Sequence, residues 1–195
     1  MSGPRNRGLA SSLREHRGRN VSGQAYALTV LTPILDGHAE ALRAHLDALP
    51  EGPASPLARV PGTHLARWVV IDQVKYQGHG QRHRDALSSA RLLFTSNFDG
   101  PLDPYLDKLR TSLGEDADAV WGHCVGYPGH RDAAGFARWL KAHQLEAALF
   151  FAAYGDHTLE QVHANLDKRA RLIAFALEAQ GLEPEQLKAR FLERF

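Results

Sequence analysis

The sequence predicts an α+β fold in which four strands form one antiparallel sheet and helices cover one of its faces. Two observations support this prediction. Stretches rich in β-branched and aromatic residues alternate with stretches whose apolar residues recur every three or four positions. The chain of 195 residues, 44% of them hydrophobic, is also long enough to bury a full core. Residues 24–195 are predicted to form one domain, preceded by a disordered basic tail at residues 1–23.

The first half of the domain is predicted as strand, helix and strand. Residues 25–34 alternate in character and end near a proline, which suits a strand terminus. Asp36 is placed to cap a helix over 37–49, and the prolines and glycines that follow would end it. Residues 63–74 then form a second β-rich stretch. The apolar face of the helix consists of Ala39, Leu42, Leu46 and Leu49.

A third strand, a second helix and an insertion are predicted next. The polar, glycine-containing stretch 75–89 is predicted to be a long hairpin connection that leads to a strand at 91–100. Turn residues then precede an amphipathic helix over 102–113. Residues 119–129 and a short helix over 132–143 form a helical insertion that a minimal fold would not need.

The last part is predicted as strand, helix and helix. Residues 146–155 are almost continuously apolar, which predicts a strand that is central or covered on both faces. Thr158 is placed to cap a long helix over 159–180, with Gln161 in its first turn. The stretch 183–195 has helical spacing and is predicted to dock on a neighbouring element or on a partner subunit.

Without the insertion, this order is βαββαβ, the arrangement of the ferredoxin-like fold, with an extra C-terminal helix. Helices on one face of such a sheet leave the other face uncovered. A large apolar sheet face is rarely exposed to water. We therefore expect a homodimer in which two sheets close on each other.

Composition excludes several classes of protein. The formal charge of +1 gives no indication of nucleic-acid binding. The single cysteine excludes an intramolecular disulfide framework and fits a reducing cytoplasm. No apolar run approaches the ~20 residues needed to cross a bilayer, and residues 1–23 lack the apolar core of a signal peptide. The arginines of this tail are expected to be solvated, or else to contact anionic partners.

The second predicted strand carries the first candidate site residues. Strict alternation places His64 on one face with Ala66 and Trp68, and Arg67 on the other. Either face directs a titratable or charged group into a semi-enclosed space, where burial is unfavourable without a partner. His64 is predicted to be a base, proton donor or ligand, and Arg67 the partner of a carboxylate ligand. The structural alternative is an internal hydrogen bond or salt bridge, for instance between Arg67 and Asp99.

Two further segments carry candidates. Asp99 ends the third predicted strand, either as a site residue or as the residue that fixes the next turn or caps the next helix. The segment WGHCVGYP brings Trp121, His123, Cys124 and Tyr127 together between glycines. It is predicted to be the wall of a ligand pocket or a packed corner of the fold. Cys124 is a thiolate nucleophile if a histidine lowers its pKa, and otherwise a small buried residue.

Histidines outside these segments are weaker candidates. His143 ends the short helix, and His157 and His163 lie beside or on the last long helix. A histidine that faces a sheet from a helix can hold haem or a metal, but no set of metal ligands can be assigned. The sequence has no HExxH, GxSxG, Walker or GxGxxG motif and no zinc spacing. These absences argue against hydrolase and nucleotide-binding functions.

The topology of residues 25–180 resembles that of the dimeric α+β barrel superfamily. The segments THLARWVVID, LLFTSNFDG and WGHCVGYP resemble those of uncharacterised bacterial peroxidase-associated and EthD-like proteins. The superfamily includes small monooxygenases, chlorite dismutases and dye-decolourising peroxidases, and the resemblance implies a cavity between sheet and helices for a small hydrophobic molecule or haem. The dye-decolourising peroxidases carry GxxDG; only Asp99 and Gly100 agree here, because Ser96 replaces the first glycine.

Three functions are predicted from these observations. The first is a cytoplasmic small-ligand-binding α+β barrel protein, with a haem-dependent peroxidase or monooxygenase as its enzymatic form. The second is a non-catalytic accessory or interaction subunit. The third is a cofactor-free monooxygenase or isomerase. The predicted catalytic residues are His64, Arg67 and Asp99, and the predicted cofactor-binding residues are His123, Trp121, Tyr127 and His143.

Overall fold

The structure is a computed structural model that describes residues 19–74, 78 and 87–194. Most of the predicted hairpin connection and residues 1–18 of the predicted tail lie outside the described residues. The chain divides into two units, Met1–Asp156 and His157–Phe195, within what the sequence predicted as one domain and its tail. Across the described residues, no helix combines the length and the apolar character that crossing a bilayer requires.

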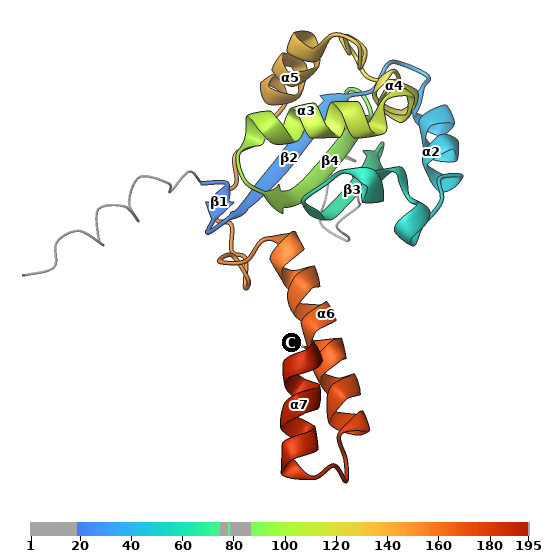
Figure 1. The fold of residues 1–195 in the computed structure, drawn as a ribbon. Coiled ribbons are helices and arrows are strands. Elements are labelled where there is room, and N and C mark those ends of the chain that lie inside the picture. The colour runs from blue at the N-terminus through green and yellow to red at the C-terminus, as the bar shows by residue number, and fades with distance from the viewer. Residues whose placement is uncertain (1–18, 75–77, 79–86, 195) are drawn as a thin grey trace, which may run out of the picture. The chain divides into compact units, whose positions relative to one another are not determined.

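An antiparallel sheet forms the centre of the first unit (Figure 1). Its strand order in the described part of the chain is β1-β2-β4-β3. The α+β class, the antiparallel sheet and its three long strands are therefore confirmed. The strands are β1 (Val21–Ser22), β2 (Ala25–Pro33), β3 (Thr63–Ile71) and β4 (Arg91–Asp99).

The short strand β1 lies in residues that the sequence assigned to the tail. Asn20 fixes the chain here, because its carbonyl oxygen accepts a hydrogen bond from the Ala27 N–H at 2.8 Å. Its side-chain oxygen accepts a second from the Ala147 N–H at 2.7 Å. Gly23 then turns the chain into β2 with a φ of 63°, which favours glycine. Regular structure in the described part of the first unit thus includes residues before 24.

The predicted fourth strand, residues 146–155, is not a strand in the structure. The chain pairs with the edge of β2 only briefly, where the Leu145 N–H donates to the Thr29 carbonyl at 2.8 Å. Leu149 and Phe151 are then 88% and 78% exposed. A continuously apolar strand needs cover on both faces. The described helices of the first unit cover one face of this sheet, so within that unit the segment meets no second face covered by helices.

Four α-helices and two short 3-10 helices, η1 (Gly52–Ala54) and η2 (Pro56–Arg59), lie in the described part of the first unit, and Figure 1 shows α3 and α5 over one face of the sheet. Asp132 caps α5, with its carboxylate accepting from the Gly135 N–H at 2.9 Å, because Asp is a favoured N-cap. The cap predicted for α2 is wrong: the helix starts after His38, not Asp36, and no side chain caps it. The four are α2 (Ala39–Asp47), α3 (Leu102–Leu113), α4 (Glu115–Trp121) and α5 (Ala133–Ala142).

The core lies between these helices and the sheet. Every second residue along most of β2 and β4 points toward the helices, so Val30, Phe94 and Phe98 are 0% exposed. Trp121, at the end of α4, is fully buried among them. The aromatic rings pack edge to face: Phe94 and Trp121 lie 5.2 Å apart at an angle of 87°.

The second unit is a pair of helices, α6 (Leu159–Glu178) and α7 (Pro184–Arg194). The predicted cap is confirmed: Thr158 Oγ1 accepts from the Gln161 N–H at 3.2 Å, and Gln161 returns a bond to the Thr158 N–H at 2.9 Å. The rings of Phe175 and Phe191 hold the two helices together at 5.7 Å. Neither of these fully described helices contains a buried residue.

Candidate functional site on the uncovered sheet face

The two faces of the sheet differ in their environment. Trp68 packs on the covered face, where its ring lies 5.7 Å from that of Phe94. Alternate residues of β3 emerge on the other face, and Leu65 and Val69 are 70% and 39% exposed there. Arg67 is exposed between them. The structure therefore assigns Arg67 to the uncovered face, which strand alternation alone left open.

A β-bulge changes the position of His64. Thr63 pairs with Phe98, and Leu65 pairs with the preceding residue of β4, so His64 is an extra residue in β3. A bulge re-aims the side chain at that point. His64 Nε2 lies 2.7 Å from Asp99 Oδ1, and Asp99 alternates with buried Phe98, so it belongs to the uncovered face. The predicted alternation, which grouped His64 with Trp68, is wrong at this residue.

The three predicted catalytic residues therefore share one face of the sheet. Arg67 Nε donates a hydrogen bond to Thr95 Oγ1 at 3.2 Å, across the β3–β4 pair. Asp99 pairs with His64 instead of providing the salt bridge to Arg67 that was offered as the structural alternative. Asp99 also does not cap α3, whose N-cap is Pro101. The Asp99 carboxylate is therefore a hydrogen-bond partner of the His64 ring.

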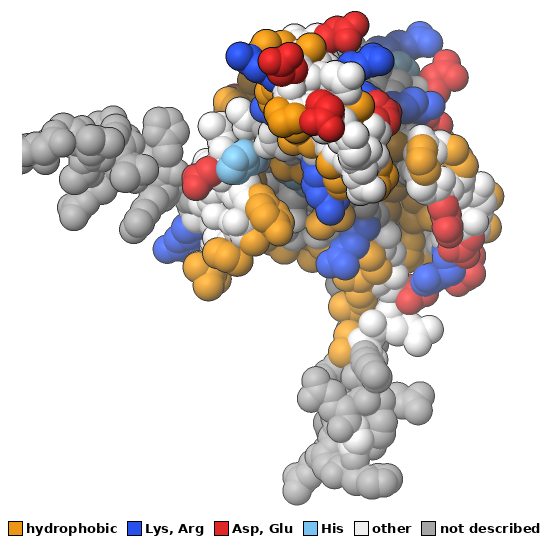
Figure 2. Space-filling model, turned by 60° about the horizontal axis from the view of Figure 1, so that its bottom comes forward, with side chains coloured by type: hydrophobic (Ala, Val, Ile, Leu, Met, Phe, Trp, Pro, Cys, Tyr) orange, Lys and Arg blue, Asp and Glu red, His pale blue; other side chains and the backbone are white. Residues whose placement is uncertain are grey.

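A hollow of about 470 Å³ opens on this face beside Arg67. Its volume is in the range of small-molecule sites. The hollow lies on the opposite side of the sheet from the cavity that the resemblance implies. Figure 2, turned by 60° from the view of Figure 1, shows that hydrophobic side chains reach the surface of the molecule beside Lys and Arg side chains. The lining residues are Leu28, Thr29, Leu65, Ala66, Arg67, Thr95 and Asn97.

The His64–Asp99 pair is partly shielded from water. The two side chains are 27% and 15% exposed. A carboxylate bonded to one ring nitrogen of a histidine fixes the orientation of the ring. This pair therefore has the arrangement of a proton acceptor and donor, and it adjoins Leu65, which lines the hollow.

The residues predicted to bind a cofactor are not gathered around one space. Trp121 is fully buried in the core, so it belongs to a packed corner. Tyr127 donates its hydroxyl to Asp118 Oδ1 at 2.8 Å. His123 Nδ1 lies 3.1 Å from His38 Nδ1. Burial, with His38 and His45 nearby, lowers the pKa of His123.

His143 is the fourth predicted cofactor residue. Its Nδ1 lies 2.8 Å from the Trp139 carbonyl oxygen. The Trp139 ring lies between His143 and Tyr127, with centroid distances of 4.9 and 5.3 Å. These packed side chains do not fit a haem as a common ligand set. Within the described ranges, no group of three or more His, Cys, Asp or Glu side chains is arranged to hold a metal ion.

No pattern in the sequence predicts the polar cluster that the structure shows around Asp118. Its Oδ1 accepts hydrogen bonds from the Tyr127 hydroxyl and the His130 N–H, both at 2.8 Å, and its Oδ2 lies 2.6 Å from His130 Nδ1. Burial alone would raise the pKa of Asp118, but the bonds from His130 and Tyr127 outweigh it and hold that pKa below its usual value. The partners are nine and 12 residues away, a spacing that matches no motif.

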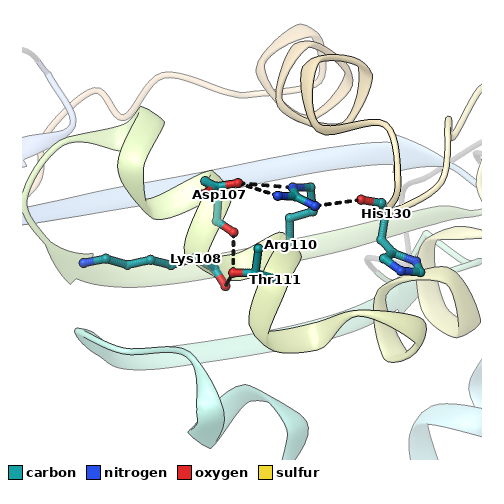
Figure 3. Close-up of polar contacts among 5 residues, drawn as sticks. All are labelled: Asp107, Lys108, Arg110, Thr111 and His130. Carbon is teal, nitrogen blue, oxygen red and sulfur yellow. Dashed lines mark hydrogen bonds and ion pairs between the residues drawn. The ribbon is translucent and has the colours of Figure 1, made fainter.

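Arg110 ties this cluster to α3, as Figure 3 shows. Its Nη1 donates to the His130 carbonyl at 3.2 Å, while its Nη2 donates to Asp107 at 2.7 Å. The loop between α4 and α5 is thus fixed at both the main chain and the side chain of His130. We interpret the Asp118 cluster as a structural clamp, because its carboxylate is fully used in holding this loop.

No protein-family model matches the chain, and no curated protein or solved structure matches it. The function is therefore inferred from the geometry of the uncovered face alone.

Proposed function

We propose that the chain binds a small amphipathic molecule with a carboxylate group on the uncovered face of its sheet. The observation that carries this proposal is the hollow beside Arg67, in which a guanidinium, two hydroxyls and an amide lie beside the side chains of Leu28, Leu65 and Ala66. Polar groups that fix the orientation of a ligand beside apolar side chains are typical of small-molecule sites.

The polar end of the ligand would bind to Arg67. The guanidinium is held in place by Thr95 at 3.2 Å and carries further N–H donors. A planar guanidinium in a fixed orientation pairs with a carboxylate through two parallel hydrogen bonds. Asn97, the β4 partner of Leu65, adds an amide to the same hollow.

The apolar end would lie along β3. Leu65 and Val69 flank Arg67 on the same face and are 70% and 39% exposed. Burial of such side chains by a hydrocarbon ligand is favourable by about 25 cal/mol per Å². A ligand with one carboxylate and a short alkyl chain would therefore bind Arg67 through the carboxylate and Leu65 and Val69 through the alkyl chain.

Replacing Arg67 with glutamine is expected to weaken the binding of decanoate about tenfold while leaving that of decanol unchanged, because only decanoate carries a charge for the guanidinium. Isothermal titration calorimetry measures both affinities. Arg138→Gln, an exposed arginine of α5, is the matched control and should bind decanoate as the wild type does. If the wild-type protein binds the acid and the alcohol equally well, or neither, the proposal fails.

A second candidate function is cofactor-free proton transfer to a ligand in this hollow. The 2.7 Å contact of His64 with Asp99, next to the hollow, favours it. Proton transfer is the isomerase form of the predicted cofactor-free enzyme, with His64 as the base. Asp99 would fix the orientation of the His64 ring through their hydrogen bond.

The wild type is then expected to accelerate exchange of the acidic C2 hydrogens of 3-oxodecanoate with deuterated water, measured by NMR. His64→Gln should abolish the acceleration, and Asp99→Asn should reduce it about 100-fold, within the range of general-base effects. Unchanged decanoate affinity in both variants would show that the site is intact. Equal exchange rates with wild type and His64→Gln would contradict catalysis by this pair.

The fold proposed here is the ferredoxin-like one of the dimeric α+β barrel proteins. Two backbone contacts support it. Leu31 N–H donates to the His143 carbonyl at 3.0 Å, and Leu145 N–H donates to the Thr29 carbonyl at 2.8 Å. They place residues 143–145 along the free edge of β2, where the fourth strand of that fold would lie.

Two other predicted functions remain predictions. Haem binding would appear as a Soret band when the protein is titrated with haem, and its absence would reject the haem-dependent oxidoreductase. A non-catalytic accessory subunit is supported by the exposed side chains of Leu149, Phe151 and Tyr154, which are 78–88% exposed. That function predicts that neither decanoate nor decanol binds.

A further inference from the structure

Two histidines that the proposed function does not use face each other at the ends of two helices. His38 directly precedes α2, and His123 follows the end of α4 by two residues. These helices lie side by side (Figure 1). The Nδ1 atoms of the two rings are 3.1 Å apart, although 85 residues separate them in the sequence. His38 is exposed, so the pair can be reached from solvent.

The backbone fixes the positions of both histidines. Leu35 bonds to each of them: its N–H donates to the His123 carbonyl at 2.8 Å, and its carbonyl accepts from the His38 N–H at 3.0 Å. Beside these bonds, Ile34 and Cys124 form an antiparallel bridge. A binding site gains affinity when the elements that carry its groups are already held in place. The two rings are therefore brought together by the fold itself.

The spacing of the two nitrogens fits two ligands of one metal ion. Neutral imidazole binds Zn²⁺ at about 2.0–2.1 Å. Two nitrogens at that distance from an ion and 3.1 Å from each other form an angle of about 98° at the ion, between the values of octahedral and tetrahedral sites. The alternative is a hydrogen bond between two neutral rings, in which one Nδ1 donates its proton to the other.

A third imidazole in this region has a nitrogen without a partner. His45 lies seven residues after His38, and at 100° per residue this places it on the same side of α2. Among the described residues, its Nε2 is buried and has no hydrogen-bond partner. His45 is also near enough to His123 to act on it electrostatically. A buried polar atom without a partner requires an explanation, and a water molecule on the ion would provide that partner.

We propose that His38 and His123 bind one transition-metal ion of the zinc type through their Nδ1 atoms, with water in its remaining positions. Imidazole nitrogen suits Zn²⁺ and its neighbours in the first transition row. Cys124 takes no part, because its thiol is buried and accepts a hydrogen bond from Thr32. Two protein ligands agree with the absence of a three-residue metal group in the described ranges. Neither histidine lines the hollow beside Arg67, so the metal site is separate from the ligand site.

Zinc titration tests the two ligands. By isothermal titration calorimetry at neutral pH, the wild type should bind one Zn²⁺ per chain more tightly than any further ion. His38→Ala and His123→Ala should each weaken this binding at least about 30-fold, and the double variant should be no weaker than either, because one remaining imidazole holds the ion poorly. His163→Ala, which changes an exposed histidine of α6, is the matched control and should bind as the wild type does.

His45 is tested in the same titration. His45→Ala should weaken the binding of Zn²⁺ about tenfold, as the loss of a group that bonds to a metal ligand does. An affinity equal to that of the wild type would overturn the part given to His45.

Co²⁺ locates the ion in the wild-type protein and needs no substitution. It accepts the same imidazole ligands as Zn²⁺, and its unpaired electrons broaden the NMR signals of nearby amides. The amide signals of Leu35, His38 and His123 should broaden at the lowest Co²⁺ concentrations, and an excess of Zn²⁺ should restore them. Broadening centred elsewhere would overturn the proposal. So would equal Zn²⁺ affinities of the wild type, His38→Ala and His123→Ala, which would leave only a hydrogen bond between the rings.

Discussion

Replacing Trp121 with alanine is expected to cost the protein about 3–5 kcal/mol of unfolding free energy, the usual range for an aromatic side chain removed from a core. Trp121 is fully buried, and its ring contacts those of Trp68, Phe94 and Phe136 at 5.2–5.8 Å. These partners come from β3, β4 and α5. The deletion would therefore leave a cavity where three elements meet, and none of them can close it without moving the others.

The loss should come from packing and not from hydrogen bonding. Among the described residues, the buried Trp121 Nε1 has no hydrogen-bond partner. The Phe94 ring stands at 87° to it, an edge-to-face arrangement of the two rings. Trp121→Phe removes the N–H and keeps much of the apolar volume, so we expect it to cost only about 1–2 kcal/mol, a modest shape change in a packed core.

Urea unfolding followed by far-UV circular dichroism, at one protein concentration, measures both variants. Leu149→Ala is the matched control. Its side chain is 88% exposed, and we expect a change within about 0.5 kcal/mol. A loss below about 1 kcal/mol for Trp121→Ala would contradict the packing of this corner.

The elements that the sequence predicted correctly have strong local signals. The strands β2, β3 and β4 and the helix α3 follow from apolar periodicity, which predicts the type of each element, although it left open which face of β3 is covered. The start of α6 follows from Thr158 and Gln161, whose reciprocal bonds involve residues only three positions apart.

The element that the sequence predicted wrongly depends on the environment of the whole sheet. Residues 146–155 have the composition of a strand, but a strand that is apolar on both faces needs two covered faces, and the described helices of the first unit cover one. Whether helices cover one face or two is a property of the assembled fold. No short stretch of the sequence indicates how many faces of the sheet the helices cover.

For the candidate site, the sequence identified the residues but not their arrangement. His64, Arg67 and Asp99 were each singled out, yet the pairing of His64 with Asp99 depends on a bulge between Thr63 and Leu65. A bulge shifts the alternation by one residue and leaves no motif. The Asp118 cluster was missed for a related reason: its bonds join a helix to a loop 12 residues away.

Cys124 is expected to react with a thiol reagent at least 100-fold more slowly in the native protein than in urea. It is 3% exposed. Burial raises the pKa of its thiol to about 11, although a hydrogen bond from the Thr32 hydroxyl at 3.2 Å acts in the opposite direction. A rise of about two pKa units lowers the reactive thiolate fraction near pH 8 about 100-fold, before access is considered.

The rate of thionitrobenzoate release from Ellman's reagent at pH 8 measures this directly. Leu149→Cys in a Cys124→Ser background is the control, because residue 149 is 88% exposed and its thiol should react at the rate of a free one. A nucleophilic Cys124 would need a protonated histidine beside it. The neighbouring His123 does not meet this need, because its Nδ1 faces the Nδ1 of His38 at 3.1 Å and the pKa of His123 is lowered. A native Cys124 that reacts within tenfold of the control would overturn this reasoning and make the thiol, and not His64, the group to pursue.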